Sequence, residues 1–203
     1  MSPSGEGLRE RRRRQTRQEI HTATLRLARE HGFDKVTIEM ISSEAGVSPR
    51  TFFNYFPNKE AAAVFGPQDL SPGPTAEFVA AGPARPGEVL RDLTGLLLRE
   101  LAGNPPLRRD MHDVFALAHE HPGVLAAMLA QFDAFGETVA ATVAERMGRR
   151  PGDEVPNLIA AVALTAVRSG LERWSRDEPA DSEDSPVPYV ERSVNLLHTL
   201  LAS

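Results

Sequence analysis

Residues 46–60, GVSPRTFFNYFPNKE, combine four aromatic rings with several side chains that donate hydrogen bonds. In a helix, Phe52 and Phe56 are four residues apart and share one face, which predicts that both rings pack inward. The side chains left on the other side are Arg50, Thr51, Phe53, Asn54 and Tyr55. Arginine and asparagine hydrogen-bond to base edges in the major groove, and threonine contacts the thymine methyl group. The segment therefore predicts the reading edge of a DNA recognition helix.

The residue pattern gives little support for other chemistry. The chain has no cysteine, which excludes disulfides and thiolate metal sites. His112 and His119 are seven residues apart and lack the i, i+4 spacing that is typical of a helical metal site. The sequence contains no phosphate-binding glycine loop, nucleophile motif or carboxylate pair that stands out. We therefore expect a protein that is not an enzyme and that binds neither a metal nor a cofactor.

Charge is distributed unevenly along the 203 residues. Residues 1–60 carry 11 Lys and Arg against 8 Asp and Glu, and the remaining residues carry 12 against 20. Arg14 and Arg17 belong to an arginine-rich run and lie where a helical pattern begins. A basic end on an acidic chain predicts contact with a polyanion, so we expect these two arginines to bind DNA phosphates. Whether residues 1–12 are ordered or form a solvated tail is left open.

The sequence shows no sign of secretion or membrane insertion. Its uninterrupted apolar runs are far shorter than the roughly 18 residues that a spanning helix needs. No apolar signal segment follows the arginine-rich start. We expect a cytoplasmic protein with no membrane partner.

Helical periodicity recurs along the whole chain, and no alternating strand pattern interrupts it. Thr37 is a suitable N-cap for a short helix that ends at Gly46, and Ser48 followed by Pro49 suits the start of the next. Asn58 can cap a further helix. The pattern predicts an all-α protein of about nine helices, whose N-terminal domain has three helices and a helix-turn-helix.

A segment rich in proline and glycine, residues 66–87, predicts a linker with at most one short helical turn. It divides the chain into a helix-turn-helix domain at residues 1–65 and a helical domain at residues 88–203. We expect the second domain to bind a ligand and to form the dimer.

A ligand site in the second domain is suggested by apolar side chains on its central helices. They are Met111, Phe115, Met128, Phe132, Phe135 and Trp174. Such residues could enclose an apolar molecule, although the same spacing describes a packed core equally well. Arg168 interrupts an apolar run and joins the candidate site. It could extend to solvent, pair with an acid across a dimer, or bind an anionic group of a ligand.

The last two helical segments each carry two apolar faces, although a helix needs only one to cover its own core. A second apolar face predicts a second partner, which favours a homodimer. The residues proposed for this interface are Leu164, Val167, Leu171, Val194, Leu197 and Leu201. The alternative is that these helices lie in the centre of a monomer.

Residues 32–61, GFDKVTIEMISSEAGVSPRTFFNYFPNKEA, resemble the DNA-binding segment of the TetR family of bacterial transcriptional repressors. The shared features include the Gly-Phe pair, the Ala-Gly-Val-Ser turn at residues 45–48 and the aromatic run into Phe-Pro-x-Lys-Glu. Further along, HPGVLAAMLAQFDAFGETVAATVAERMG and ALTAVRSGLERW are similar to the subgroup of acyl-CoA-like or mycofactocin-type regulators.

The resemblance implies roles for matching residues. Thr37 and Lys59 would bind phosphates, and we count Ser48, the cap of the recognition helix, among the DNA-binding residues. The residues that would face DNA are Arg50, Thr51, Phe53, Asn54 and Tyr55. Two positions depart from the family pattern: Phe53 replaces a common tyrosine and Ser42 a common alanine, which leaves the operator contacts open.

The predicted function is a ligand-responsive repressor that binds an inverted-repeat DNA operator as a dimer and is released by a small apolar or acyl-type effector. Two alternatives remain at this point. The protein could be an activator, or an effector-binding dimer that does not bind DNA in a sequence-specific way.

Overall fold

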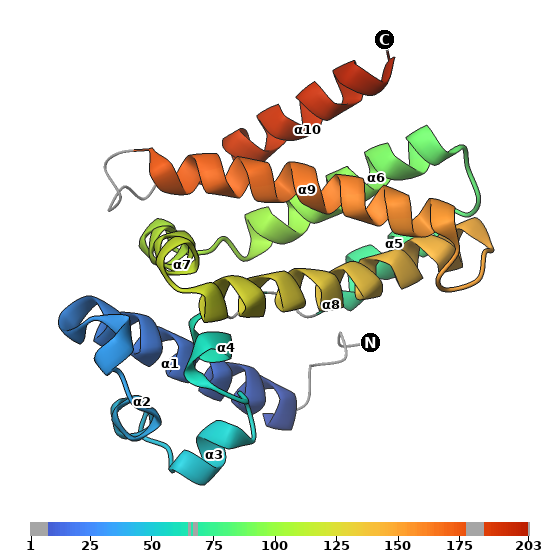
Figure 1. The fold of residues 1–203 in the computed structure, drawn as a ribbon. Helices are drawn as coiled ribbons and strands as arrows, with labels where there is room; N and C mark the ends of the chain where they lie inside the picture. Colours follow the sequence, from blue (N-terminus) through green and yellow to red (C-terminus); the bar gives the residue numbers. More distant parts are fainter. Residues whose placement is uncertain (1–7, 65, 67–68, 178–184, 203) are drawn as a thin grey trace. The chain divides into compact units, whose positions relative to one another are not determined.

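The computed structural model describes residues 8–64, 66, 69–177 and 185–202, and these form ten α-helices and one short 3-10 helix (Figure 1). No strand occurs in these ranges. The predicted all-α fold is confirmed. The helix beyond the expected nine is α5 (Pro72–Ala80), which forms inside the segment expected to be a linker.

The first of two compact units consists of residues 1–66 and 116–129. Its helices are α1 (Leu8–His31), the 3-10 helix η1 (Phe33–Lys35), α2 (Ile38–Glu44), α3 (Pro49–Phe53) and α4 (Lys59–Ala63). Both α2 and α4 pack against α1 (Figure 1). The core of this unit is small and is built from Ile20, Ala23, Leu27, Val36, Ile41, Phe52, Phe56 and Ala62.

The short helices of this unit begin where the sequence predicts. The Thr37 hydroxyl accepts a hydrogen bond from the N–H of Met40, and the Asn58 side chain accepts one from Ala61. Such caps satisfy N–H groups that a helix of five to seven residues cannot satisfy internally. Local sequence therefore determines where these helices start, because the cap and its partner are only three residues apart.

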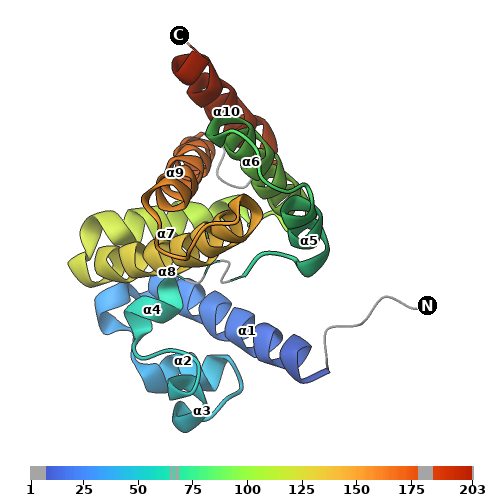
Figure 2. The same cartoon turned by 90° about the vertical axis from the view of Figure 1, so that its right-hand side faces the viewer.

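The second unit consists of residues 67–115 and 130–203. It contains α5, α6 (Pro86–Gly103), α9 (Glu154–Arg176) and α10 (Val187–Ala202), and α10 packs against both α6 and α9 (Figure 2). Two further helices, α7 (Arg108–Glu120) and α8 (Pro122–Met147), each have one part in either unit. The division therefore differs from the single boundary expected at residues 66–87, since residues 116–129 group with the N-terminal residues.

Helix α5 forms despite its prolines because they lie in its first turn. Pro72 follows Ser71 at the helix start, where a missing N–H removes no helical hydrogen bond. Phe78 is buried and joins the main core of the second unit with side chains of α6, α8 and α9. Burial of this ring gives α5 a tertiary anchor that the composition of residues 66–87 does not suggest.

Helix α8 is long and apolar enough to cross a membrane by length and composition alone. Helices in the core of a soluble protein have the same properties, and here Phe135, Val139 and Val143 of α8 belong to the core of the second unit. Its length and composition therefore do not by themselves make α8 a membrane span.

Helices α9 and α10 approach each other closely at Gly170. A Cβ atom at this position would lie 2.5 Å from the Cα and 2.8 Å from the backbone nitrogen of Val190. Val190 is fully buried, and its backbone cannot move aside in the way that a flexible side chain can. The two helices can therefore cross at this distance only if residue 170 has no side chain.

We expect Gly170→Ala to lower the free energy of unfolding by roughly 1–3 kcal/mol, because overpacking forces the two backbones apart. Gly95→Ala is the matched control. It also lies within a helix, and the nearest atom to its new Cβ would be a side-chain nitrogen of Arg99 at 3.7 Å. Chemical denaturation followed by circular dichroism measures both variants. Equal stability of the two would contradict the proposed crossing.

Candidate nucleic-acid interface

The turn between α2 and α3 is formed by local hydrogen bonds. Gly46 has a φ of +66°, which glycine adopts at little cost, and the N–H of Val47 donates to the carbonyl of Ser42 at 2.9 Å. The Ser48 hydroxyl then accepts from the N–H of Thr51 at 3.1 Å and lies 2.9 Å from the Thr51 hydroxyl. These bonds determine where α3 begins and hold its first turn.

The aromatic run of α3 divides between the core and the surface, as predicted. Phe52 and Phe56 are buried, whereas Phe53 is 56% exposed and meets the Phe52 ring edge-on at 5.6 Å between centroids. Arg50 and Asn54 are exposed as well. Two rings thus anchor α3, and the third stands on its outer surface beside groups that can hydrogen-bond to bases.

A recess of about 430 Å³ connects the start of α1 with α3. Its lining residues are Arg12, Arg13, Thr51, Asn54 and Tyr55. Two cations of α1, Thr51 of α3 and two residues of the turn that follows α3 therefore share one concave surface. The sequence predicted that Thr51, Asn54 and Tyr55 face DNA, but it singled out Arg14 and Arg17 rather than Arg12 and Arg13. The arginine run could have predicted Arg12 and Arg13 as well, because it continues the helical pattern toward the N-terminus.

The two arginines that the sequence did single out have different surroundings. Arg14 is exposed, whereas Arg17 is half-buried, with its guanidinium carbon 5.0 Å from the centre of the Phe56 ring. Burial lowers the pKa of Arg17, and the nearby charge of Arg13 lowers it further. The structure therefore places Arg17 against the core of the first unit, where it also supports the ring that anchors α3.

The Lys59 ammonium group faces the backbone of the turn before α2. Its Nζ donates to the carbonyl oxygens of Phe33 at 2.8 Å and Val36 at 3.1 Å, lies 3.4 Å from that of Asp34, and sits 4.6 Å from the centre of the Phe33 ring. An ammonium group has three N–H donors, so these contacts use its hydrogen-bonding capacity inside the protein. Thr37, the other residue expected to bind phosphate, is exposed and caps α2.

The residues predicted to bind a ligand do not form one group. Met128 is buried in the first unit, and the other six lie in the second. Trp174 is fully buried beneath the Arg108 guanidinium at 5.1 Å, and Phe135 belongs to the main core. Met111 and Phe115 of α7 are half-buried. The structure brings together Phe132 and Arg168, whose guanidinium carbon lies 5.9 Å from the ring centre.

The residues predicted for the dimer interface largely fill the protomer. Leu164 and Val194 are only 8% and 4% exposed and belong to core clusters of the second unit. The half-buried residues packed against these clusters are Val167, Leu171 and Leu197. For these five, the second apolar face of each helix covers the protomer's own core, which is the alternative left open by the sequence. Leu201 is exposed.

A second recess, of about 550 Å³, lies where α9 ends and α10 begins, and sequence reasoning did not find it. Its lining residues are Arg173, Asp177, Pro188, Tyr189 and Arg192. The Tyr189 hydroxyl donates to Asp177 Oδ2 at 2.6 Å, and this hydrogen bond raises the pKa of Tyr189. Arg173 donates to the Tyr189 carbonyl. No local motif signals this recess, because its residues come from two helices.

The capped turn, the anchored short helix and its exposed polar edge define a helix-turn-helix protein, a class that binds DNA through the second helix of the motif. Residues 20–61 match the model of bacterial regulatory proteins of the tetR family, and residues 106–200 match that of the MftR C-terminal domain. The chain belongs to the TetR family of transcriptional regulators. The resemblance seen in the sequence is thereby confirmed for both parts of the chain.

Two relatives extend over most of the chain. The transcriptional regulator TcmR of Streptomyces glaucescens is 28% identical over 197 residues, which is 93% of this chain and 85% of TcmR. The mycofactocin biosynthesis regulator MftR of Mycobacterium tuberculosis is 26% identical over 83% of this chain and 84% of MftR. Among solved structures, Thermus thermophilus FadR in complex with lauroyl-CoA covers 89% of this chain and 92% of its own, with 27% identity and a TM-score of 0.46.

The positions of Arg13 and Lys59 lead to opposite expectations for DNA binding. We expect Arg13→Gln to weaken binding to all DNA sequences and to reduce the slope of log affinity against log salt by about 1, because one phosphate contact is lost. We expect Lys59→Met to leave that slope unchanged and to lower the free energy of unfolding by roughly 1–3 kcal/mol, since partly buried carbonyls lose their donor.

Filter binding at several salt concentrations and thermal unfolding measure the two quantities. Lys35→Met is the control for loss of an exposed lysine charge from the same unit. If Lys59→Met instead reduced the salt slope and left stability intact, Lys59 would bind phosphate, as the family resemblance implies.

Proposed function

We propose that this protein is a repressor that binds an inverted-repeat DNA operator as a homodimer and releases it when a small apolar or acyl-type effector binds. The observation that carries the DNA-binding part is the shared recess of α1 and α3, which is lined by two arginines and by Thr51, Asn54 and Tyr55. Polar groups that can read bases and cations that can bind phosphate thereby lie on one surface.

Arg50 and Asn54 are the residues that we propose read base edges. Arg50 lies on α3 and Asn54 directly after its last residue; both are exposed, and the inner face of the helix is held by Phe52, so their side chains are free to enter a major groove. Exposed Phe53 is suited to apolar contact with a thymine methyl group. Arg12 and Arg13 would bind the adjacent phosphates, which positions the helix without reading sequence.

The proposed dimer uses apolar side chains that the protomer leaves uncovered. They are Leu158 on α9 and Leu196, Leu200 and Leu201 on α10. Regulators of this family act as dimers, and a second copy of the chain supplies a matching apolar surface by symmetry. A dimer would hold two recognition helices about 34 Å apart, the spacing of successive major grooves on one face of DNA.

An effector would act by favouring one arrangement of the helical unit over another. We propose that it lowers operator affinity by about 10- to 100-fold, which corresponds to a coupling free energy of about 1.4–3 kcal/mol. Coupling of this kind is reciprocal, so operator DNA weakens effector binding by the same factor.

Footprinting on DNA upstream of the protein's own gene tests operator binding, and we expect a protected site with dyad symmetry. Arg50→Gln should lose about 1–3 kcal/mol of discrimination at one base pair per half-site, because one side chain reads that pair. Arg109→Gln removes an exposed arginine from α7 and should leave the footprint unchanged. A protected site without dyad symmetry would refute the dimeric mode of binding.

Replacement of both Leu196 and Leu200 by glutamate tests the dimer interface. These side chains are 57% and 65% exposed in the protomer, so the charges should be harmless to a monomer and cost several kcal/mol if buried at an interface. We expect a folded monomer with little operator affinity. Leu107→Glu, at a leucine that is 69% exposed on another part of the chain, should remain dimeric. Light scattering distinguishes the outcomes, and an intact dimer in the double variant would place the interface elsewhere.

A further inference from the structure

Arg168 is a half-buried cation within the apolar stretch AAVALTAVRSGL of α9. In the described part of the chain, no carboxylate lies within ion-pair distance of its guanidinium group. Glu172, one helical turn further along α9, would be its natural partner. However, Glu172 Oε1 accepts a 2.6 Å hydrogen bond from Arg176 on its other side. Arg168 therefore has a charge that its own helix does not neutralise.

The packing of α8 against α9 explains where this cation lies. A Cβ atom at Gly136 of α8 would be 3.8 Å from Leu164 Cδ1, so Leu164 packs directly against the α8 backbone. One turn away on each helix are Phe132 and Arg168, with the guanidinium carbon 5.9 Å from the ring centre. Arg168 thus lies one turn from the point where Leu164 meets α8, with its guanidinium over the Phe132 ring.

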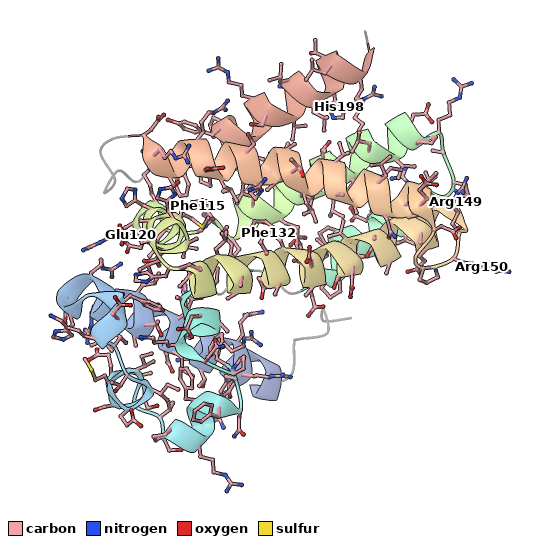
Figure 3. All side chains as sticks on the ribbon, in the orientation of Figure 1. Phe115, Glu120, Phe132, Arg149, Arg150 and His198 are labelled. Atoms are coloured by element: carbon pink, nitrogen blue, oxygen red, sulfur yellow. The ribbon has the colours of Figure 1, made fainter. Side chains whose placement is uncertain are left out.

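Several apolar side chains near Arg168 are only partly buried. Val167 immediately precedes Arg168 in α9 and Leu171 lies about one turn further along; both are half-buried, as is Phe132. Phe115, also half-buried, projects from α7 on the side that faces α9 (Figure 3). Four partly covered apolar side chains in the vicinity of one unpaired guanidinium can contact the hydrocarbon part of a ligand.

The physical chemistry of arginine indicates what the polar part of that ligand would be. Contact with a phenylalanine ring uses only the face of the guanidinium plane. The N–H groups in that plane remain suited to a carboxylate, which they can bind through two parallel charge-assisted hydrogen bonds. A half-buried cation gains most from such a partner, because burial raises the cost of leaving it unpaired.

We propose that Arg168 binds the carboxylate of an anionic amphiphile, with its guanidinium stacked on Phe132 and the ligand's hydrocarbon chain against Val167 and Leu171. This inference rests on the proposed effector function and narrows the effector class to an acid with an apolar tail. Of the roles that the sequence left open for Arg168, it selects contact with an anionic ligand group.

Isothermal titration calorimetry on the full-length protein without DNA tests the proposal, with decanoate and 1-decanol as probes of equal chain length. We expect decanoate to bind the unmodified protein at least tenfold more tightly than decanol. Arg168→Gln should reduce decanoate affinity by about tenfold and leave decanol affinity unchanged, and Arg168→Lys should keep part of the preference. Arg173→Gln, which removes a cation from the surface of the same helix, should behave like the unmodified protein.

Equal affinity for the two probes in the unmodified protein would overturn the proposal, as would an Arg168→Gln variant that retains full decanoate affinity. Failure of both probes to bind would overturn it too. The comparison within the unmodified protein does not depend on whether the variant folds, and thermal unfolding checks the variant separately. An operator-release assay then separates the two proposals: decanoate that binds through Arg168 without releasing DNA would support this site and contradict its role in induction.

Discussion

The recognition helix α3 has only five residues, and a helix of that length is not stable by itself. Its geometry depends on the burial of Phe52 and Phe56 in a core of eight side chains shared with α1, α2 and α4. Lys59 adds a second contact, because its ammonium group, at the start of α4, donates hydrogen bonds to carbonyl groups of the turn before α2. The exposed edge of α3 is therefore positioned by contacts on its opposite side.

The basic groups of the first unit divide into two kinds according to their surroundings. Arg17 and Lys59 face aromatic rings and backbone carbonyls within the protein, where they contribute to its stability. Arg12 and Arg13 line an open recess beside α3. Since a phosphate can bind only a cation that it can reach, the charge balance of residues 1–60 overstates the number of groups available to DNA. The position of each cation therefore decides whether it stabilises the first unit or can bind a DNA phosphate.

In the second unit, the surroundings of two arginine side chains differ in the same way. Glu172 accepts a hydrogen bond from Arg176, and the guanidinium carbon of Arg168 lies over the Phe132 ring at 5.9 Å from its centre. Arg146 offers the contrast: its guanidinium is buried, but it meets the Asp92 carboxylate, the Gly82 carbonyl and the Phe78 ring. That arginine ties α8 to α5 and α6. The two arginines thus differ in their partners: Arg146 has internal acceptors, whereas Arg168 contacts a ring.

The sequence by itself determined the features that depend on residues a few positions apart. Helix caps at Thr37, Ser48 and Asn58, the turn at Gly46 and the inward facing of Phe52 and Phe56 follow from hydrogen bonds and helical spacing within one turn of chain. Other features were decided only by the tertiary structure. Lys59 donates to carbonyl groups 23 to 26 residues away in the chain. Leu164 and Val194 are buried within the protomer, and Arg168 lies over the Phe132 ring. A periodic apolar face predicts that one side of a helix is buried, but it does not predict which surface packs against that side. The packing partner depends on the path of the whole chain.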